Sequence, residues 1–200
     1  MSKGGVRGVV SPNYPTAPSQ YSRQFQDQFV NVVRLNTNTL TNAINAPKVF
    51  GSYYDTTTQT NLLGTNLITV NTVDVAFNTV TRAPFSKIYV AESGIYNIQF
   101  SAQLDKTGGG ADAIYIWLRK NGVDVANSAS KVVVNGNNDE KIAAWNFVIL
   151  LSANDYIELA WSSADATMHI EAFPASTVAP VHPLIPSVIL TVCWVSNVPG

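Results

Sequence analysis

The residues that could do chemistry in this chain are few and scattered. His169 and His182 are its two histidines, and their separation of 13 positions is not that of a close metal-binding pair. His169 falls in a strand-like stretch, whereas His182 falls between prolines. Because neither histidine has a partner at a recognisable spacing, we interpret both as structural. We predict no metal site, no cofactor and no catalytic residue.

Carboxylates in predicted turns offer a second possible chemistry. The loops of a β-sandwich can gather such groups into a calcium site with six to eight oxygen ligands. No spacing here resembles a dedicated calcium-binding loop, so solvated turn residues are the favoured interpretation and a bound calcium ion is the alternative. A sugar-cleaving enzyme would need two carboxylates flanking one glycosidic bond, and these scattered positions do not favour it. The carboxylates concerned are Asp105, Asp112, Asp124, Asp139, Glu140, Asp155 and Asp165.

The remaining reactive or recognition residues also favour structural roles. The triple glycine at 108–110 is not followed by Lys-Thr or by a helical pattern, so it predicts a hairpin turn, not a phosphate-binding loop. Cys193 is the single cysteine, which excludes an intrachain disulfide, and it is interpreted as a small buried apolar residue. Four tryptophans could form a sugar platform, but each lies in an alternating strand, which favours the core or an interface. They are Trp117, Trp145, Trp161 and Trp194.

The composition favours a neutral, hydrogen-bonding β surface. Charged residues make up only 12% of the chain, and its polarity comes largely from 19 Asn and 17 Thr. A net charge of −1 gives no argument for nucleic acid or for an anionic membrane. The sequence shows no signal peptide and no apolar run long enough to span a bilayer. We therefore expect synthesis in a cytosol, without membrane insertion or nucleic-acid binding.

The first 47 residues differ from the rest of the chain. They carry four basic side chains and one acidic one, whereas residues 48–200 are net acidic. Residues 1–20 are rich in Gly and Pro, which predicts an extended arm, and residues 20–45 have apolar positions at helical spacing. The helix, capped by Ser19 or Ser22, should be short, because poor helix formers follow Leu35. Its apolar stripe could lie on its own domain, or it could form a multi-chain bundle or docking helix.

After Pro47 the pattern changes to short alternating strands separated by turn signals, among them the hairpin dipeptide Asn121-Gly122. About ten strands at this spacing predict an all-β antiparallel jelly-roll sandwich. One strand is unusual, because residues 143–151, AAWNFVILL, are apolar on both faces. A strand that covers a single core needs only one apolar face, so the second face predicts a further contact.

The chain from Val49 to Val195 resembles the jelly-roll domain shared by tumour necrosis factor and the globular heads of the first complement component. Gly94-Ile95-Tyr96 opens a long strand, and the later strand–turn–strand reads IAAWNFVILLSANDYIELAWSS. The last strand, IPSVILTVCWV, runs close to the end of the sequence. The resemblance covers about three quarters of the chain.

Nearly the whole chain also resembles virion proteins of tailed bacteriophages of the marine and cyanobacterial type. The segments that carry this likeness are SPNYPTAPSQYSRQFQDQFVNVVRLNTN, GSYYDTTTQTN, GIYNIQFSAQLDK, IWLRKNGVDVANS and AAWNFVILLSANDYIELAWSSAD. The resemblance implies a non-enzymatic homotrimer on the virion surface, with an N-terminal segment (1–47) that attaches to other virion proteins and a jelly-roll knob (48–200). The residues assigned to attachment are Lys3, Arg7, Tyr14, Tyr21, Phe25, Phe29, Val32 and Val33.

A trimer would also explain the two-faced strand. If Trp145 and Phe147 face inward, the opposite face meets the neighbouring subunits, and Asn146 needs a polar partner there. The last strand also has apolar side chains on both of its faces. The residues assigned to the trimer interface are Ala144, Asn146, Val148, Leu150, Ile189, Cys193, Val195 and Tyr96.

Three functional hypotheses follow. The first is a capsid decoration protein or short head fibre, and its variant is a tail-associated knob that binds a host receptor or glycan. The second is a soluble trimeric, lectin-like binding module. The third, a sugar-degrading enzyme, is disfavoured by the scattered carboxylates.

Overall fold

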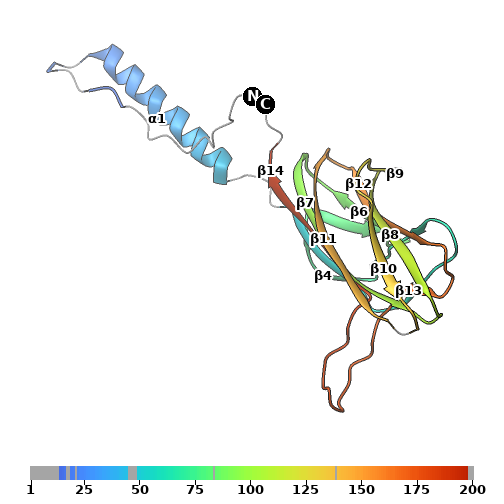
Figure 1. Cartoon of the computed structure of the whole chain (residues 1–200). Coiled ribbons are helices and arrows are strands. Elements are labelled where there is room, and N and C mark those ends of the chain that lie inside the picture. Colours follow the sequence, from blue (N-terminus) through green and yellow to red (C-terminus); the bar gives the residue numbers. More distant parts are fainter. Residues whose placement is uncertain are drawn as a thin grey trace. The chain divides into compact units, whose positions relative to one another are not determined.

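A computed structural model describes residues 14–16, 19–20, 22–44, 49–82, 84–137 and 139–197. The chain divides into two compact units, Met1–Ala46 and Pro47–Gly200. The helix α1 belongs to the first unit, and the strands form the second (Figure 1). Within the described residues, no helix combines the length and hydropathy needed to cross a membrane.

Helix α1 spans Arg23–Ile44, so it is longer than the sequence suggested. Ser22 caps its first turn, as one of the two predicted caps, because its hydroxyl accepts a main-chain N–H at 3.4 Å. The helix continues past Leu35 through residues with poor helix propensity. Asn36 and Thr39 each donate from the side chain to a main-chain carbonyl one turn earlier, at 2.9 Å. These bonds satisfy the polar side chains inside the helix instead of drawing the backbone into turns.

The second unit is an antiparallel sandwich of two sheets, which confirms the predicted fold class. In the described part of this unit, ten strands have four or more residues, and four short ones have two or three. Sheet A contains β1 (Phe50–Asp55), β2 (Gln59–Thr60), β4 (Thr72–Phe77), β7 (Gly94–Lys106), β11 (Lys141–Leu151), β13 (Met168–Ile170) and β14 (Val188–Ser196). Sheet B contains β3 (Asn66–Leu67), β5 (Thr79–Arg82), β6 (Lys87–Val90), β8 (Ala111–Lys120), β9 (Val123–Asp124), β10 (Ser130–Asn135) and β12 (Tyr156–Ser163).

The long strand β7 organises sheet A. One of its edges pairs with β11 from Gly94 to Leu104. Its other edge pairs first with β14 and then, nearer its end, with β13. Across the sheet the order is therefore β11, β7, β14, β1 and β4, while β13 continues the line of β14 and β2 pairs with the other edge of β13. Sheet B runs β10, β8, β12, β6 and β5.

The core lies between the sheets and is built from the inward half of each alternating strand. Trp161 is the largest fully buried side chain, and Tyr53 bonds the Thr79 hydroxyl at 2.6 Å inside the core. The triple glycine at 108–110, predicted to be a hairpin turn, instead joins β7 of sheet A to β8 of sheet B, so that prediction is wrong. A tight turn does join β8 and β9 where the sequence predicted it. Asn121 and Gly122 have φ values of 50° and 78°, the left-handed pair that a two-residue hairpin of this type needs.

Candidate functional site

The two apolar faces of β11 have different surroundings. Trp145 and Phe147 point between the sheets, where Trp145 meets Phe100 edge-on with ring centroids 4.7 Å apart. The opposite face is open, with Val148 66% exposed and Leu150 50% exposed. The larger set of apolar side chains therefore faces inward, and the smaller set lies on the outer face of sheet A.

The same outer face continues across β14, β1 and β4. Ile189 and Val195 are 42% and 56% exposed, and Phe50 stacks on Phe77 with ring centroids 6.1 Å apart. Cys193 is exposed, so its interpretation as a small buried apolar residue is wrong for the subunit. It shares the outward alternation of Ile189 and Val195. We call the surface formed by the outward side chains of β4, β1, β14, β7 and β11 the outer face.

Strand register arranges the outer face in rows. One row runs Val148, Asn97, Cys193, Phe50 and Phe77, each opposite the next on neighbouring strands. The centre of the face, along β7, is polar, while β11 on one side and β1 with β4 on the other are apolar. The polar centre consists of Asn97, Gln99, Ser101 and Gln103.

The structure places seven of the eight residues assigned to the interface on this outer face. The predicted polar partner of Asn146 is Asn97, whose side-chain oxygen accepts at 3.2 Å, although both belong to one subunit. Tyr96 is the exception. It is fully buried between the sheets and donates its hydroxyl to the Glu92 carbonyl at 2.6 Å. As an inward residue of β7 it offers no surface to a neighbour, so its assignment to the interface is wrong. Burial raises its pKa to about 12.

The residues assigned to attachment lie in the first unit. Lys3, Arg7 and Tyr21 fall outside the described residues. Phe25 and Phe29 stack along α1 with centroids 6.3 Å apart, and Tyr14 lies 5.9 Å from Phe29.

The apolar stripe of the helix nevertheless stays open. Phe29 is 42% exposed and Val33 is 37% exposed, while Val32 is partly covered.

The turn carboxylates are distributed among separate cations. Asp112 and Asp165 both bind the buried ammonium of Lys106, the latter at 2.9 Å. Three further pairs, 2.8 to 3.0 Å long, are Asp155–Lys120, Asp124–Arg119 and Asp139–Lys141. These pairings spread the carboxylates over different turns and leave them bound to cations of the chain itself, which argues against the calcium alternative.

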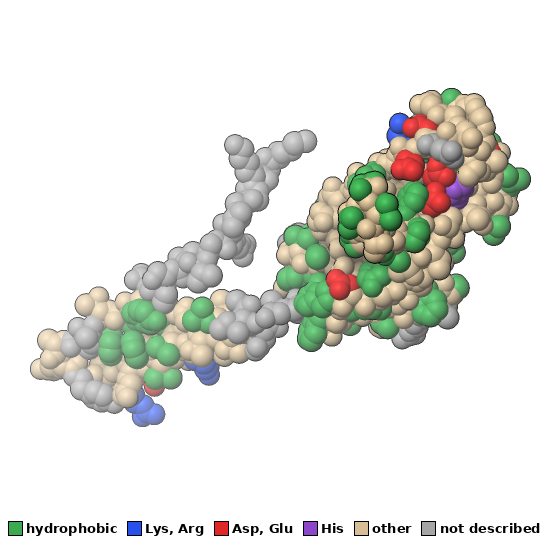
Figure 2. Space-filling view, turned by 90° about the horizontal axis from the view of Figure 1, so that it is seen from below, with side chains coloured by type: hydrophobic (Ala, Val, Ile, Leu, Met, Phe, Trp, Pro, Cys, Tyr) green, Lys and Arg blue, Asp and Glu red, His purple; other side chains and the backbone are tan. Residues whose placement is uncertain are grey.

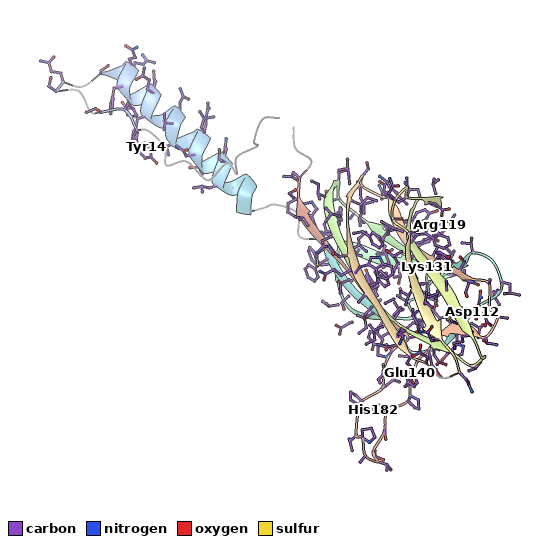
Figure 3. All side chains as sticks on the ribbon, in the orientation of Figure 1. Tyr14, Asp112, Arg119, Lys131, Glu140 and His182 are labelled. Carbon is purple, nitrogen blue, oxygen red and sulfur yellow. The ribbon has the colours of Figure 1, made fainter. Side chains whose placement is uncertain are left out.

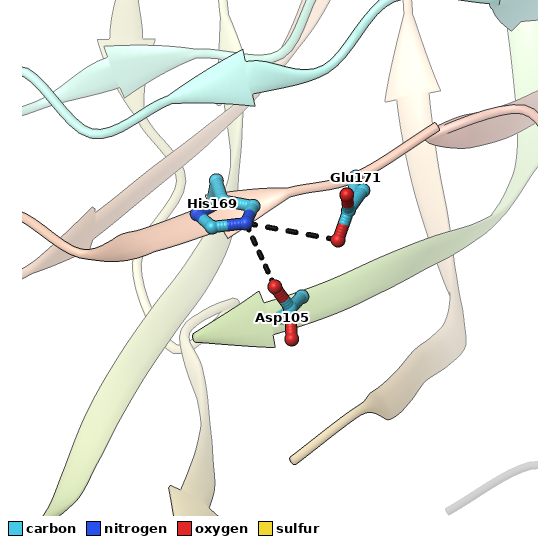
Figure 4. Close-up of side chains that lie close together, drawn as sticks. All are labelled: Asp105, His169 and Glu171. Atoms are coloured by element: carbon cyan, nitrogen blue, oxygen red, sulfur yellow. Dashed lines mark ion pairs between the residues drawn. The ribbon is translucent and has the colours of Figure 1, made fainter. Parts of the chain in front are cut away.

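One group of side chains departs from that pattern, and sequence reasoning missed it. Asp105 on β7 and His169 on β13 face each other across a strand pair, with His169 Nε2 2.8 Å from Asp105 Oδ2. Glu171 Oε2 lies 3.7 Å from the same nitrogen (Figure 4). Within the described residues, this is the one group of three or more potential metal ligands. The signal in the sequence was His-x-Glu, which puts both side chains on one side of a strand.

Comparisons with known proteins address the fold. No family model matches the sequence, and no curated protein matches it as a relative. Among solved structures, the globular domain of the zebrafish complement 1qA protein is similar, with a TM-score of 0.50 over 76% of this chain and 100% of that domain. The sandwich has the C1q/TNF-like fold. The zebrafish domain is only 12% identical to this chain in sequence, so the two share their backbone architecture.

The C1q-like fold confirms the jelly-roll part of the resemblance noted from the sequence. The resemblance to bacteriophage virion proteins stays a prediction, as do the trimer and the attachment role of the first unit.

Proposed function

We propose that this chain is the subunit of a non-enzymatic homotrimeric virion structural protein. Its C1q-like domain forms the trimer and is displayed on the particle, and the first 47 residues attach it to another virion protein. The single observation that supports the proposed trimer is the exposed apolar surface on the outer face of sheet A.

The outer face is unusual for a surface that meets only water. Monomeric proteins rarely expose large contiguous apolar patches, whereas here Val148, Leu150, Ile189, Phe50 and Phe77 share one sheet face. The charged side chains are few, and the polar centre is made of amides and hydroxyls that can form hydrogen bonds across a contact. An interface with apolar areas, neutral polar groups and few charges has the composition of a subunit contact.

A groove extends the outer face beyond the strands. It holds about 540 Å³ and is bounded by Tyr54, Asp74, Leu184, Pro186 and Ile189, among others. Leu184 and Pro186 belong to the segment 174–186, which projects from the sandwich and carries His182 (Figure 3). In the proposed trimer a side chain of the neighbouring subunit fills this groove.

The first unit supports the attachment role by its exposed apolar stripe. Phe29, Val33 and Leu40 remain open along six turns of helix, on a segment with more basic than acidic residues. A helix of this kind gains most of its stability from a partner surface. In the proposed protein that surface belongs to the particle or to the matching helices of the trimer.

Within this proposal the chain is a capsid decoration protein or a short head fibre, made in the bacterial cytoplasm. The alternative is a tail-associated knob or a soluble binding module that contacts a receptor or glycan. That alternative is favoured by the projecting segment, where Val178 and Val181 are 75% and 73% exposed.

Three experiments test the proposal. Light scattering on the purified full chain should give three times the 21.6 kDa chain mass, and a monodisperse monomer at 100 µM would refute the trimer. Mass spectrometry of purified particles should find the chain, and its absence from them would leave only the soluble binding module. Antibody labelling then separates head from tail: label confined to the tail would overturn the decoration role.

A further inference from the structure

The group Asp105, His169 and Glu171 lies at one end of the outer face of sheet A. Asp105 continues the outward alternation of β7 after Gln103, and it is paired in register with His169. Glu171 is held one step further along, because its main-chain N–H donates to the Gln103 carbonyl at 2.8 Å. Asp105 and His169 are therefore positioned by paired strands, and Glu171, which directly follows β13, is held by its main-chain bond to β7.

The charge of this group is not balanced by the cations nearby in sequence. The Lys106 side chain points to the inner side of the sheet, where Asp112 and Asp165 bind it. Lys141 is paired with Asp139. The exposed carboxylate of Glu140 adds further negative charge.

Burial, together with the carboxylates of Asp105 and Glu140, raises the pKa of Glu171 above its ordinary value. Acidic side chains gather beside a histidine at the end of the domain that Figure 2 views, on a surface that is otherwise mostly neutral. The group thus holds closely spaced negative charge with one imidazole, which attracts a cation.

The distances suit a small dication. Ligand atoms 2.0 to 2.2 Å from a tetrahedral zinc ion lie about 3.3 to 3.6 Å from one another. Here the two separations from His169 Nε2 are 2.8 and 3.7 Å, and one ligand atom from each of the three residues lies within 4.8 Å of the other two. Rotamer adjustments of a few tenths of an ångström to about 1 Å would bring the three into a coordination shell.

The ligand types indicate which dication fits. Imidazole nitrogen suits Zn²⁺ and neighbouring transition metals, whereas Ca²⁺ and Mg²⁺ take oxygen ligands and need more of them. We propose that Asp105, His169 and Glu171 form a binding site for one Zn²⁺ or similar transition-metal ion per subunit. His169 supplies Nε2, the carboxylates supply one oxygen each, and water completes the shell on the exposed side, where Glu171 is 29% exposed.

A metal ion bound at this site would crosslink two strands. It ties the three-residue strand β13 to the long strand β7, directly before the chain enters the projecting segment 174–186. A metal that binds the folded chain and not the unfolded chain stabilises it by mass action. At a free Zn²⁺ concentration a hundred times the Kd, the midpoint of thermal unfolding should rise by about 5–10 °C.

The test uses full-length protein stripped with chelator and titrated with Zn²⁺ by calorimetry. The expected result is one ion per chain, undisturbed by 1 mM Ca²⁺, with Co²⁺ giving the visible absorption bands of a low-coordinate nitrogen–oxygen site. His169→Ala should weaken binding at least 100-fold, and His182→Ala, which alters the other histidine, should leave it unchanged. No binding up to 100 µM free Zn²⁺, or equal loss in both variants, would overturn the site.

A second variant distinguishes the loss of a metal ligand from a folding defect in His169→Ala. Glu171→Gln keeps the volume of a partly exposed side chain and should retain the circular dichroism spectrum of the parent while weakening Zn²⁺ at least tenfold. If Glu171→Gln folds normally and binds Zn²⁺ with unchanged affinity, Glu171 is not a ligand and the three-residue site is refuted. Both outcomes are independent of whether the chain is a trimer.

Discussion

Replacing Val148 by Asp tests the proposed trimer at the middle of β11. Val148 is 66% exposed in the subunit, so within the subunit the substitution should be nearly neutral, within about 0.5 kcal/mol. In the trimer the same side chain would be covered by a neighbour. Full burial of a valine contributes about 1.5–3 kcal/mol, so covering the exposed two thirds contributes about 1–2 kcal/mol per copy.

The introduced carboxylate weakens association further. Its row on the outer face holds Asn97, Cys193, Phe50 and Phe77, and none of them carries a positive charge. An unpaired carboxylate removed from water costs several kcal/mol. Even a partial penalty of about 2 kcal/mol brings the sum above about 3 kcal/mol per contact, which weakens association more than 100-fold at each of three contacts.

Val123→Asp is the matched control. Val123 is 70% exposed and lies on β9 of sheet B, away from the outer face. Light scattering between 1 and 100 µM should show a folded monomer for Val148→Asp and an unchanged trimer for Val123→Asp. A Val148→Asp protein that keeps the trimer mass would refute the assignment of the outer face, and dissociation of both variants would show that the effect is not specific to it.

Two further predictions concern the stability of the subunit. Asp165 accepts the hydroxyl and the N–H of Thr167, both at 2.7 Å, and these bonds hold its pKa well below the ordinary 3.8. A lowered pKa means that its stabilising effect is complete above about pH 4 and is lost as the pH falls further, so the difference in urea midpoint between the parent and Asp165→Asn should shrink below pH 4. Gly51→Ala should lower the free energy of unfolding by about 1–3 kcal/mol in urea titrations, because the added Cβ would lie 2.5 Å from the buried ring of Tyr53. An unchanged midpoint in Gly51→Ala, or a pH-independent difference for Asp165→Asn, would contradict these two predictions.

Period and composition were sufficient to predict the long strands and their two faces, but not the short strands β2 and β5. The alternation along β11 correctly separated Val148 and Leu150 from Trp145 and Phe147, because a strand allows no other division. The extent of α1 could not be predicted in the same way. Propensity argues against helix after Leu35, and the bonds that offset it appear only once the helix has formed.

The Asp105–His169 pair could not be predicted from the sequence for a different reason. Its two residues are 64 positions apart, and they meet only because β13 pairs with the end of β7 that lies beyond the first residues of β14. That arrangement depends on the path of the whole sheet. Local spacing contains only half of the information, the His-x-Glu pattern of residues 169–171, and this pattern is common in strands that bind nothing.

The polarity of the outer face changes along the strands, and this limits how copies can meet. The row through Val148, Phe50 and Phe77 is mostly apolar, whereas the end near Asp105 and Glu171 is acidic. In an arrangement with threefold symmetry, equivalent rows of the three copies lie at the same height, so the acidic ends would face one another. Contact should therefore close first along the apolar rows, and the acidic end should stay apart unless a bound cation reduces its charge. Zn²⁺ should then tighten association in the parent protein and have no effect in Glu171→Gln, and measuring the monomer–trimer equilibrium with and without the metal would decide it.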